Sequence, residues 1–257
     1  MSATTLNAPS ARRGVRPDSP VALVTGASGG FGRDLAVELD RLGCRVAVHY
    51  NSSSARAEET AALLTNDAVV VGGDVADFDQ AQRMVREVAR SLGDVDVVVN
   101  NGGVRKDALM AMQDPQEWES VVRTNLVGAF NVTRACLPPM LARRWGRVVN
   151  IVSPSGIIAT SGQTAYSASK AGMIGMTRTL AAECARRGVT VNALSPGFMI
   201  TGMTEHLGDK VKDDIRTRCP MGRFGTTSEV ARAIGVFLDV DYMTGQVVSV
   251  DGGVSIM

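Results

Sequence analysis

Short apolar runs recur along the chain from Val21 onward, and longer stretches of mixed polarity separate them. Each run is rich in β-branched residues and is apolar at nearly every position rather than at every second one. Such a run predicts a strand that is covered on both faces, as in a parallel sheet. The predicted strands are VALVTG (21–26), RVAVHY (45–50), AVVVGG (68–73), VDVVVN (95–100), RVVNIV (147–152), VTVNAL (189–194) and GQVVSV (245–250).

The stretches between these runs carry apolar residues at intervals of three and four. The clearest examples are FGRDLAVELDRLG (31–43) and FDQAQRMVREVARSLG (78–93), and this spacing predicts amphipathic helices. Strands that alternate with helices predict an α/β fold, a doubly wound parallel sheet of about seven strands with helices on both faces. No linker interrupts the pattern, so we expect residues 21–257 to form one Rossmann-type domain. Residues 1–20, rich in Ser, Pro and Arg, are expected to form a disordered tail; their Arg-rich start is also compatible with a transit peptide.

The overall composition limits the partners and the chemistry. The chain has 257 residues, is 45% hydrophobic and carries a formal net charge of +1, which gives no electrostatic reason to expect a nucleic acid or an anionic membrane as partner. No apolar run approaches the roughly 18 residues of a membrane span. The four cysteines form no CxxC pair and the two histidines no HExxH pattern. We therefore expect no metal site, reduced thiols and a cytoplasmic location.

The first predicted strand leads directly into TGASGGFG (25–32) and then into a predicted helix. Glycines in such a turn let the backbone approach a pyrophosphate, and the first N–H groups of the helix favour its negative charge. Because the loop opens a repeating strand–helix pattern, it predicts a dinucleotide-binding site. The candidate residues of this loop are Gly26, Ser28, Gly29, Gly30 and Gly32.

The end of the second strand indicates which dinucleotide is bound. A carboxylate there would hydrogen-bond the adenosine ribose and repel a 2′-phosphate, but the sequence continues HYNSSS (49–54), without an acidic residue. We therefore expect NADP, with Asn51 and Ser52 as donors to the phosphate. Arg56 or Arg33 would supply the positive charge, unless both are ordinary surface residues.

The segment TAYSASKAG (164–172) places Tyr166 and Lys170 four residues apart. On a helix these positions share one face, so the ammonium would stabilise the phenolate and lower the phenol pKa from its ordinary value of about 10. A phenol tuned in this way is a general acid for a carbonyl oxygen. A pair with this spacing also occurs by chance on solvated helix faces.

Two further residues, Ser153 and Asn125, favour a catalytic role for the Tyr166–Lys170 pair. Ser153 stands at the carboxyl end of a predicted strand, where open α/β sheets place their ligand-binding groups, and its hydroxyl would hold a substrate carbonyl beside the phenol. Asn125 falls on a long predicted helix, an awkward position for a polar side chain that only packs. The structural alternatives are a strand-end cap for Ser153 and a helix-surface position for Asn125.

These motifs, in this order, resemble those of the short-chain dehydrogenase/reductase family from about Val21 to the end of the chain. TGASGGFG is similar to the family's cofactor loop, NNGG (100–103) to its N-N-A-G motif, S…YSASK to its active site and SPGFMIT (195–201) to its loop beside the nicotinamide. The resemblance implies that Tyr166 is the proton donor and that Ser153 orients the carbonyl. It also implies that Lys170 binds the nicotinamide ribose and lowers the tyrosine pKa, and that Asn125 supports a water chain.

Within that family the chain most resembles the bacterial 3-oxoacyl-(acyl-carrier-protein) reductases, through segments such as EWESVVRTNL (117–126) and TGQVVSVDGG (244–253). This implies NADPH-dependent reduction of a β-ketoacyl thioester by a homotetramer, in fatty acid or polyketide-type synthesis. We also expect the substrate to enter beneath a mobile lid over about residues 199–220, whose glycines and methionines suit a flexible acyl chain, although methionine more often only fills a core. The acidic carrier protein would dock near the active-site entrance on Arg144 and Arg187, with Arg143 and Arg186 beside them. The further cofactor contacts that it implies are Asp74, Val75, Asn101, Pro196, Gly197, Met199 and Thr201.

Three departures from that subfamily leave the substrate open. Gly29 stands where the carrier-protein reductases often carry an arginine for the 2′-phosphate, Gly102 replaces the usual alanine, and MITGM (199–203) lacks an acidic residue. The main alternative is an enzyme of the same family that acts on a free alcohol or ketone, such as a sugar, a steroid or an aromatic polyketide. A catalytically silent NADP-binding regulator is a further alternative, although all four candidate catalytic residues are present.

Overall fold

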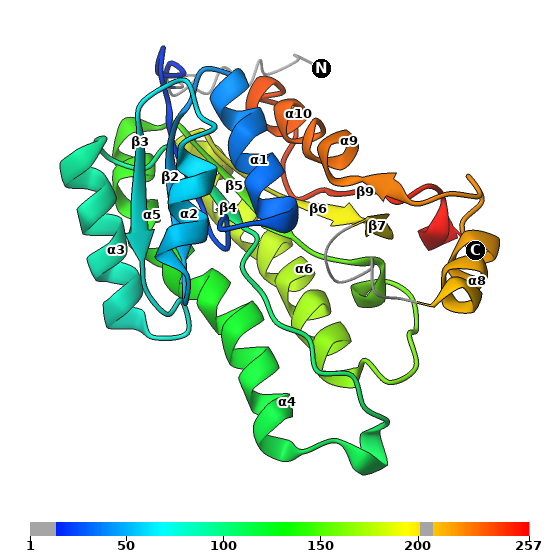
Figure 1. The fold of residues 1–257 in the computed structure, drawn as a ribbon. Coiled ribbons are helices and arrows are strands. Elements are labelled where there is room, and N and C mark those ends of the chain that lie inside the picture. Colours follow the sequence, from blue (N-terminus) through cyan, green and yellow to red (C-terminus); the bar gives the residue numbers. More distant parts are fainter. Residues whose placement is uncertain (1–13, 201–207, 257) are drawn as a thin grey trace, which may run out of the picture.

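The computed structural model of the protein describes residues 14–200 and 208–256, and within them seven parallel strands form one sheet in the order β3-β2-β1-β4-β5-β6-β9 (Figure 1). The predicted fold is therefore confirmed, and every predicted strand is present. The strands are β1 (Val21–Val24), β2 (Arg45–Tyr50), β3 (Ala68–Gly72), β4 (Val97–Asn100), β5 (Gly146–Ile151), β6 (Val189–Pro196) and β9 (Val247–Val250).

Helices cover both faces of the sheet, which is why the strands are apolar at nearly every position. Val24 packs on one face and Leu23 on the other, and both are fully buried. The first face carries α1 (Gly30–Arg41), α9 (Thr227–Ala231) and α10 (Ile234–Asp239), and the second carries α3 (Phe78–Ser91), α5 (Gly128–Arg143) and α6 (Thr164–Cys184). The other described elements are α2 (Ser54–Ala61), α4 (Pro115–Val122), α8 (Asp209–Arg218), the short strands β7 (Met199–Ile200) and β8 (Gly225–Thr226), a π-helical turn (Arg123–Val127) and four 3₁₀ turns (Met110–Met112, Pro154–Gly156, Ala185–Arg187 and Val254–Ile256).

The strand order reverses at β1, which pairs with β2 on one side and with β4 on the other. Because all strands of this sheet are parallel, their carboxyl ends meet at one edge, here called the carboxyl edge, and their amino ends at the opposite amino edge. In open α/β sheets, ligands bind outside the carboxyl edge at such a reversal. The loops that carry the predicted motifs follow β1, β4, β5 and β6 and therefore gather there.

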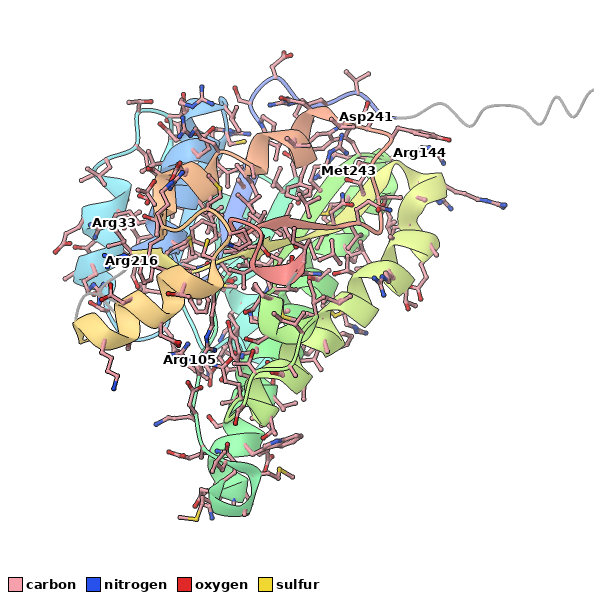
Figure 2. The ribbon with its side chains drawn as sticks, turned by 90° about the vertical axis from the view of Figure 1, so that its right-hand side faces the viewer. Arg33, Arg105, Arg144, Arg216, Asp241 and Met243 are labelled. Atoms are coloured by element: carbon pink, nitrogen blue, oxygen red, sulfur yellow. The ribbon has the colours of Figure 1, made fainter. Side chains whose placement is uncertain are left out.

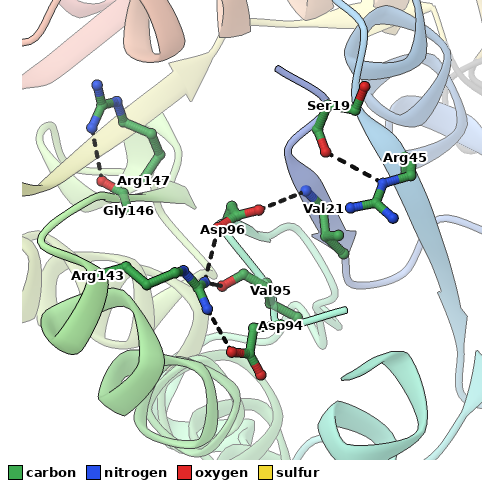
Figure 3. A network of polar contacts seen from close by, with 9 residues as sticks. All are labelled: Ser19, Val21, Arg45, Asp94, Val95, Asp96, Arg143, Gly146 and Arg147. Atoms are coloured by element: carbon green, nitrogen blue, oxygen red, sulfur yellow. Dashed lines mark hydrogen bonds and ion pairs between the residues drawn. The ribbon is translucent and has the colours of Figure 1, made fainter. Parts of the chain in front are cut away.

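A polar network at the amino edge ties β1 to α5 (Figure 3). The buried Asp96 carboxylate accepts hydrogen bonds from the Val21 N–H (3.0 Å) and from the Arg143 guanidinium (2.8 Å). Arg143 also pairs with Asp94 at 2.5 Å. Both arms of this arginine are thus used inside the subunit, and we expect it to contribute little to a surface cationic rim.

Residues 14–20 belong to the folded domain, so the expected disordered tail is wrong for this stretch. The Gly14 N–H donates to the Arg144 carbonyl (3.1 Å), and the Arg16 guanidinium reaches both Asp239 (2.7 Å) and the Leu42 carbonyl (3.3 Å). The structure does not describe residues 1–13. It also leaves out 201–207, so that Thr201 and the centre of the predicted lid lie outside the described residues.

No helix in the described part of the chain is long and apolar enough to cross a bilayer. The same residues hold no cluster of three or more His, Cys, Asp or Glu side chains suited to a metal ion. All four cysteines are buried as free thiols.

Candidate active site

The glycine-rich loop between β1 and α1 folds tightly against the start of its own helix. Gly26 has a positive φ of 64°, which side chains other than glycine rarely adopt. A Cβ atom at Gly32 would overlap the Gly26 carbonyl oxygen and would lie 2.6 Å from the Asn101 Nδ2 atom. The loop therefore presents bare backbone and the N-terminus of α1, an arrangement that fits a pyrophosphate.

Two residues that sequence reasoning missed hold this loop in place. The His49 Nδ1 atom accepts a hydrogen bond from the Gly26 N–H (3.1 Å), and its Nε2 atom lies 2.8 Å from the Gly73 carbonyl oxygen. Burial lowers the pKa of this histidine, which favours the neutral ring with the proton on Nε2 that these contacts require. The Thr25 hydroxyl accepts from the backbone N–H groups of Asn101 (3.0 Å) and Gly102 (2.9 Å).

We expect Gly32→Ala to weaken NADPH binding by about tenfold or more, because the new methyl group must displace loop backbone rather than a flexible side chain. Fluorescence titration with NADPH would measure the change. Gly175→Ala on α6 is the matched control, since a Cβ atom there meets nothing within 4 Å. Equal affinity of the Gly32→Ala variant and the wild type would contradict this account of the loop.

The structure distinguishes between the two arginines proposed for the 2′-phosphate. Arg33 is engaged with α2, where it contacts the Thr60 hydroxyl and Glu59, each at 3.1 Å. The Arg56 guanidinium instead lies against Gly29, where a Cβ atom would overlap its Nη2 atom and come within 3.3 Å of its Cζ atom. Arg56 therefore occupies space that a side chain at position 29 would need.

The other predicted cofactor residues all lie at the carboxyl edge, apart from Thr201, which lies outside the described residues. Val75 is buried and its carbonyl oxygen accepts from the Asn131 amide (2.9 Å). Asp74 lines a cavity of about 260 Å³ that also borders α4. By position, Ser28, Gly29 and Gly30 lie in the first loop, Asn51 and Ser52 follow β2, Asp74 and Val75 follow β3, Asn101 follows β4, Pro196 ends β6, and Gly197 and Met199 come after it.

Three of the four candidate catalytic residues converge. The Ser153 hydroxyl, just after β5, lowers the pKa of the Tyr166 phenol by side-chain hydrogen bonding, and it also accepts weakly from the Ser155 N–H (3.3 Å). It therefore caps the strand end and also contacts the phenol. The Lys170 Nζ atom lies 5.5 Å from the centre of the Tyr166 ring and donates to the Ile151 carbonyl (2.7 Å). Tyr166 and Lys170 share one face of α6, as their spacing predicts.

The pKa of the phenol differs from the prediction. Burial raises the pKa of Tyr166 above its ordinary value, and the hydrogen bond with Ser153 and the positive charge of Arg105 only partly oppose this. Burial also lowers the pKa of Lys170 to about 8. The pKa of the tyrosine is therefore raised rather than lowered in the protein alone, because burial, partial for Tyr166 and complete for Lys170, disfavours each charged form.

Asn125 lies in the π-helical turn that separates α4 from α5, a feature frequent at functional sites. It is 1% exposed, which rules out a helix-surface position. Its side chain exchanges two hydrogen bonds with the Val104 backbone (2.8 and 3.0 Å) and donates to the Ser169 hydroxyl (3.0 Å). Ser169 in turn donates to the Tyr166 carbonyl (2.7 Å). Asn125 thus connects the segment after β4 to the helix that carries the phenol.

Arg144 and Arg187 lie at the amino edge, because they directly precede β5 and β6. Figure 2 shows Arg144 near Asp241, well away from Arg105. The Arg144 guanidinium donates to the Arg186 carbonyl (2.7 Å). The expectation that these arginines border the entrance to the active site is therefore wrong within one subunit, since the candidate catalytic residues Ser153, Tyr166 and Lys170 lie at the carboxyl edge.

Comparison with known proteins places this site in a family. A family model described as short chain dehydrogenase matches residues 20–212. The chain belongs to this family. Short-chain dehydrogenases bind a nicotinamide cofactor, and the glycine-rich loop fits one because it leaves the backbone and the α1 N-terminus accessible. The protein is accordingly an oxidoreductase of CH–OH and C=O groups.

Two curated relatives and one solved structure are similar to this chain over most of its length. The chain is 41% identical over 238 residues to the 3-oxoacyl-(acyl-carrier-protein) reductase FabG of Staphylococcus aureus strain Mu50, covering 90% of this chain and 96% of the relative. It is 40% identical over 252 residues to the FabG protein of Thermotoga maritima, covering 94% of this short-chain dehydrogenase and 100% of the relative. A gluconate 5-dehydrogenase from Burkholderia cenocepacia, solved with NADP and tartrate, superposes with a TM-score of 0.86 at 30% identity, covering 94% of this chain and 97% of that one.

Proposed function

We propose that the protein reduces a β-ketoacyl thioester to the β-hydroxyacyl form with NADPH, as a cytoplasmic enzyme of fatty acid or polyketide-type synthesis. The Ser153 hydroxyl and the Tyr166 phenol whose pKa it lowers, both at the carboxyl edge beside the cofactor loop, carry the proposal. The similarity to FabG over nearly the whole chain supports the choice of substrate class.

The nicotinamide, when bound, supplies the hydride that reduces the ketone carbon. The residues of this chain act on the carbonyl oxygen of the ketone. Ser153 and Tyr166 present two adjacent hydroxyl donors, which stabilise negative charge as it develops on the carbonyl oxygen. The Tyr166 hydroxyl then gives its proton to that oxygen. Lys170, fixed by the Ile151 carbonyl, places its ammonium beside the ring that becomes a phenolate.

We infer NADP rather than NAD from the end of β2. No carboxylate stands there to accept hydrogen bonds from the ribose hydroxyls, and Asn51 and Ser52 are exposed polar residues in its place. Arg56 lies against the cofactor loop at Gly29 and supplies the positive charge that a 2′-phosphate needs. The bound NADP of the gluconate 5-dehydrogenase supports this choice by similarity.

The carrier protein and the oligomeric state are linked in this proposal. The six residues of β5 alone extend roughly 20 Å, so a carrier bound at Arg144 and Arg187 is separated from the catalytic residues of its own subunit by the whole sheet. We propose that these arginines serve the active site of a neighbouring subunit in a homotetramer.

Charge reversal tests this docking role. Arg144→Glu should lower kcat/KM for a carrier-bound β-ketoacyl substrate by about tenfold, since a like charge would face the acidic carrier, and should leave the small-thioester analogue unaffected. Arg86→Glu, on the exposed face of α3, is the control. If Arg144→Glu has no effect on the carrier-bound substrate, these arginines do not bind the carrier.

A second candidate follows from the solved structure. Because a gluconate 5-dehydrogenase shares this fold closely, the enzyme would act instead on a free hydroxy acid or other alcohol, with no carrier protein. A panel of short, long and polyketide thioesters together with gluconate, each assayed with NADPH or NADH and with their oxidised forms, separates the two. Preferential turnover of gluconate would favour this second candidate.

A further inference from the structure

A chain of polar side chains extends from Ser153 toward the surface, beyond the four catalytic residues. The Ser155 N–H donates to the Ser153 hydroxyl (3.3 Å), and the Ser155 hydroxyl donates to the Gln163 side chain (2.8 Å). The Gln163 amide donates to Asp107 (3.2 Å), and Asp107 pairs with the Arg105 Nε atom at 3.2 Å. We call Arg105, Asp107, Ser155 and Gln163 the polar wall.

The polar wall is held on a fixed frame. Asn125 binds both backbone groups of Val104, directly before Arg105. The Ala108 N–H donates to the Gly162 carbonyl (2.9 Å), directly before Gln163. The segment from 104 to 108 is therefore anchored at one end by Asn125 and at the other by the loop that leads into α6, which holds the backbone of Arg105 in place.

Arg105 still has donors to offer a ligand. Its side chain is 49% exposed, and among the described residues only Asp107 contacts it, through Nε. The terminal guanidinium nitrogens are thus available on the same side of the molecule as the carboxyl edge (Figure 2). The polar wall links Arg105 to Ser153 through three hydrogen bonds and one ion pair.

We propose that Arg105 hydrogen-bonds the second oxygen of the substrate, the thioester carbonyl oxygen in a 1,3 relation to the ketone, and so selects β-ketoacyl thioesters over simple ketones. In a 1,3-dicarbonyl compound the two oxygens lie a few ångströms apart, so a donor beside the Ser153–Tyr166 pair reaches one while the pair holds the other. This inference rests on the proposed function and names Arg105 as the residue that recognises the β-ketoacyl thioester class of substrate.

The ion pair between Arg105 and Asp107 favours a neutral carbonyl oxygen over a carboxylate as the substrate group that Arg105 binds. The Asp107 carboxylate opposes the charge of Arg105, whose terminal N–H groups have no hydrogen-bond partner among the described residues. Such a pair offers hydrogen bonds without net positive charge, which suits a neutral carbonyl. A free carboxylate would also meet the negative charge of Asp107, and this repulsion works against hydroxy acids as substrates.

Arg105→Met tests the inference, because methionine keeps much of the length and removes the donors. The assay compares the acetoacetyl thioester of N-acetylcysteamine with a methyl ketone of similar length that lacks the second carbonyl. We expect the ratio of kcat/KM for the thioester to that for the ketone to fall about tenfold, mainly through KM for the thioester. Arg105→Lys should restore part of the ratio, and NADPH affinity by fluorescence titration reports on folding.

Lys106→Met is the matched control. Lys106 is the neighbouring cation but pairs with Glu117 at 3.3 Å on α4, so its replacement should leave the ratio as in the wild type. An unchanged ratio in Arg105→Met, with a wild type that reduces the thioester, would overturn this inference alone. A wild type that does not reduce the thioester would overturn the proposed function and this inference with it.

Discussion

Tyr166→Phe should reduce the rate of ketone reduction by about 10²- to 10⁴-fold, the usual contribution of a positioned general acid, while NADPH still binds. The substitution removes only the hydroxyl and leaves the ring beside Lys170. Without that proton the alkoxide formed by hydride transfer must take one from water. Steady-state oxidation of NADPH measures the rate, and fluorescence titration measures cofactor binding.

The pH dependence of the same reaction gives a second reading of the role of Tyr166. Reduction requires the protonated phenol, so the rate should fall as pH rises through the pKa of Tyr166. Burial raises this pKa, so the phenol should lose its proton at higher pH than an exposed phenol, whereas the Lys170 ammonium beside it is lost as pH rises through about 8 and should lower the rate first. Ketone reduction at the wild-type rate in Tyr166→Phe would show that another group donates the proton. Ser153→Ala, which keeps the phenol, should cause a smaller loss.

Arg56→Ala should weaken NADPH binding by about tenfold to a hundredfold and change NADH binding little. A charge-assisted hydrogen bond of this kind contributes about 1.5–3 kcal/mol, and only NADPH carries the 2′-phosphate. Dissociation constants for both cofactors measure the effect. Arg33→Ala is the control, because Arg33 pairs with Glu59 and Thr60 and its loss should leave the preference for NADPH in place.

Moving the arginine from position 56 to position 29 tests the same prediction a second time. A side chain at position 29 would overlap the Arg56 guanidinium, so the space next to the loop holds one arginine from either position. Gly29→Arg in the Arg56→Ala background should restore much of the NADPH affinity, whereas Gly29→Arg alone should not improve on the wild type. If Arg56→Ala weakens NADPH and NADH equally, its effect is on the loop rather than on the phosphate.

The sequence was sufficient to predict the sheet and the edge at which the site lies. The strands are buried on both faces, so they appear as continuous apolar runs, and the motifs follow directly after them. The face shared by Tyr166 and Lys170 follows from helix geometry alone. The position of Arg144 could also have been found, because a residue that precedes a parallel strand lies at the amino edge.

Other features depend on contacts between distant segments, which spacing does not reveal. His49 supports the loop 23 residues away, and its only sequence signal is a histidine in a strand that is otherwise largely apolar. Asp107 meets Gln163 across 56 residues, through the path of two loops with no periodic pattern. The raised pKa of Tyr166 depends on how deeply the phenol is buried, and a four-residue spacing says nothing about depth.

One measurement tests the central claim most directly: kcat/KM of the wild-type protein for an acetoacetyl thioester with NADPH, compared with NADH as the reductant and with gluconate oxidation by NADP. The account predicts that reduction of the thioester with NADPH exceeds each of the other two reactions by about tenfold or more. Efficient oxidation of gluconate together with negligible reduction of the thioester would contradict it.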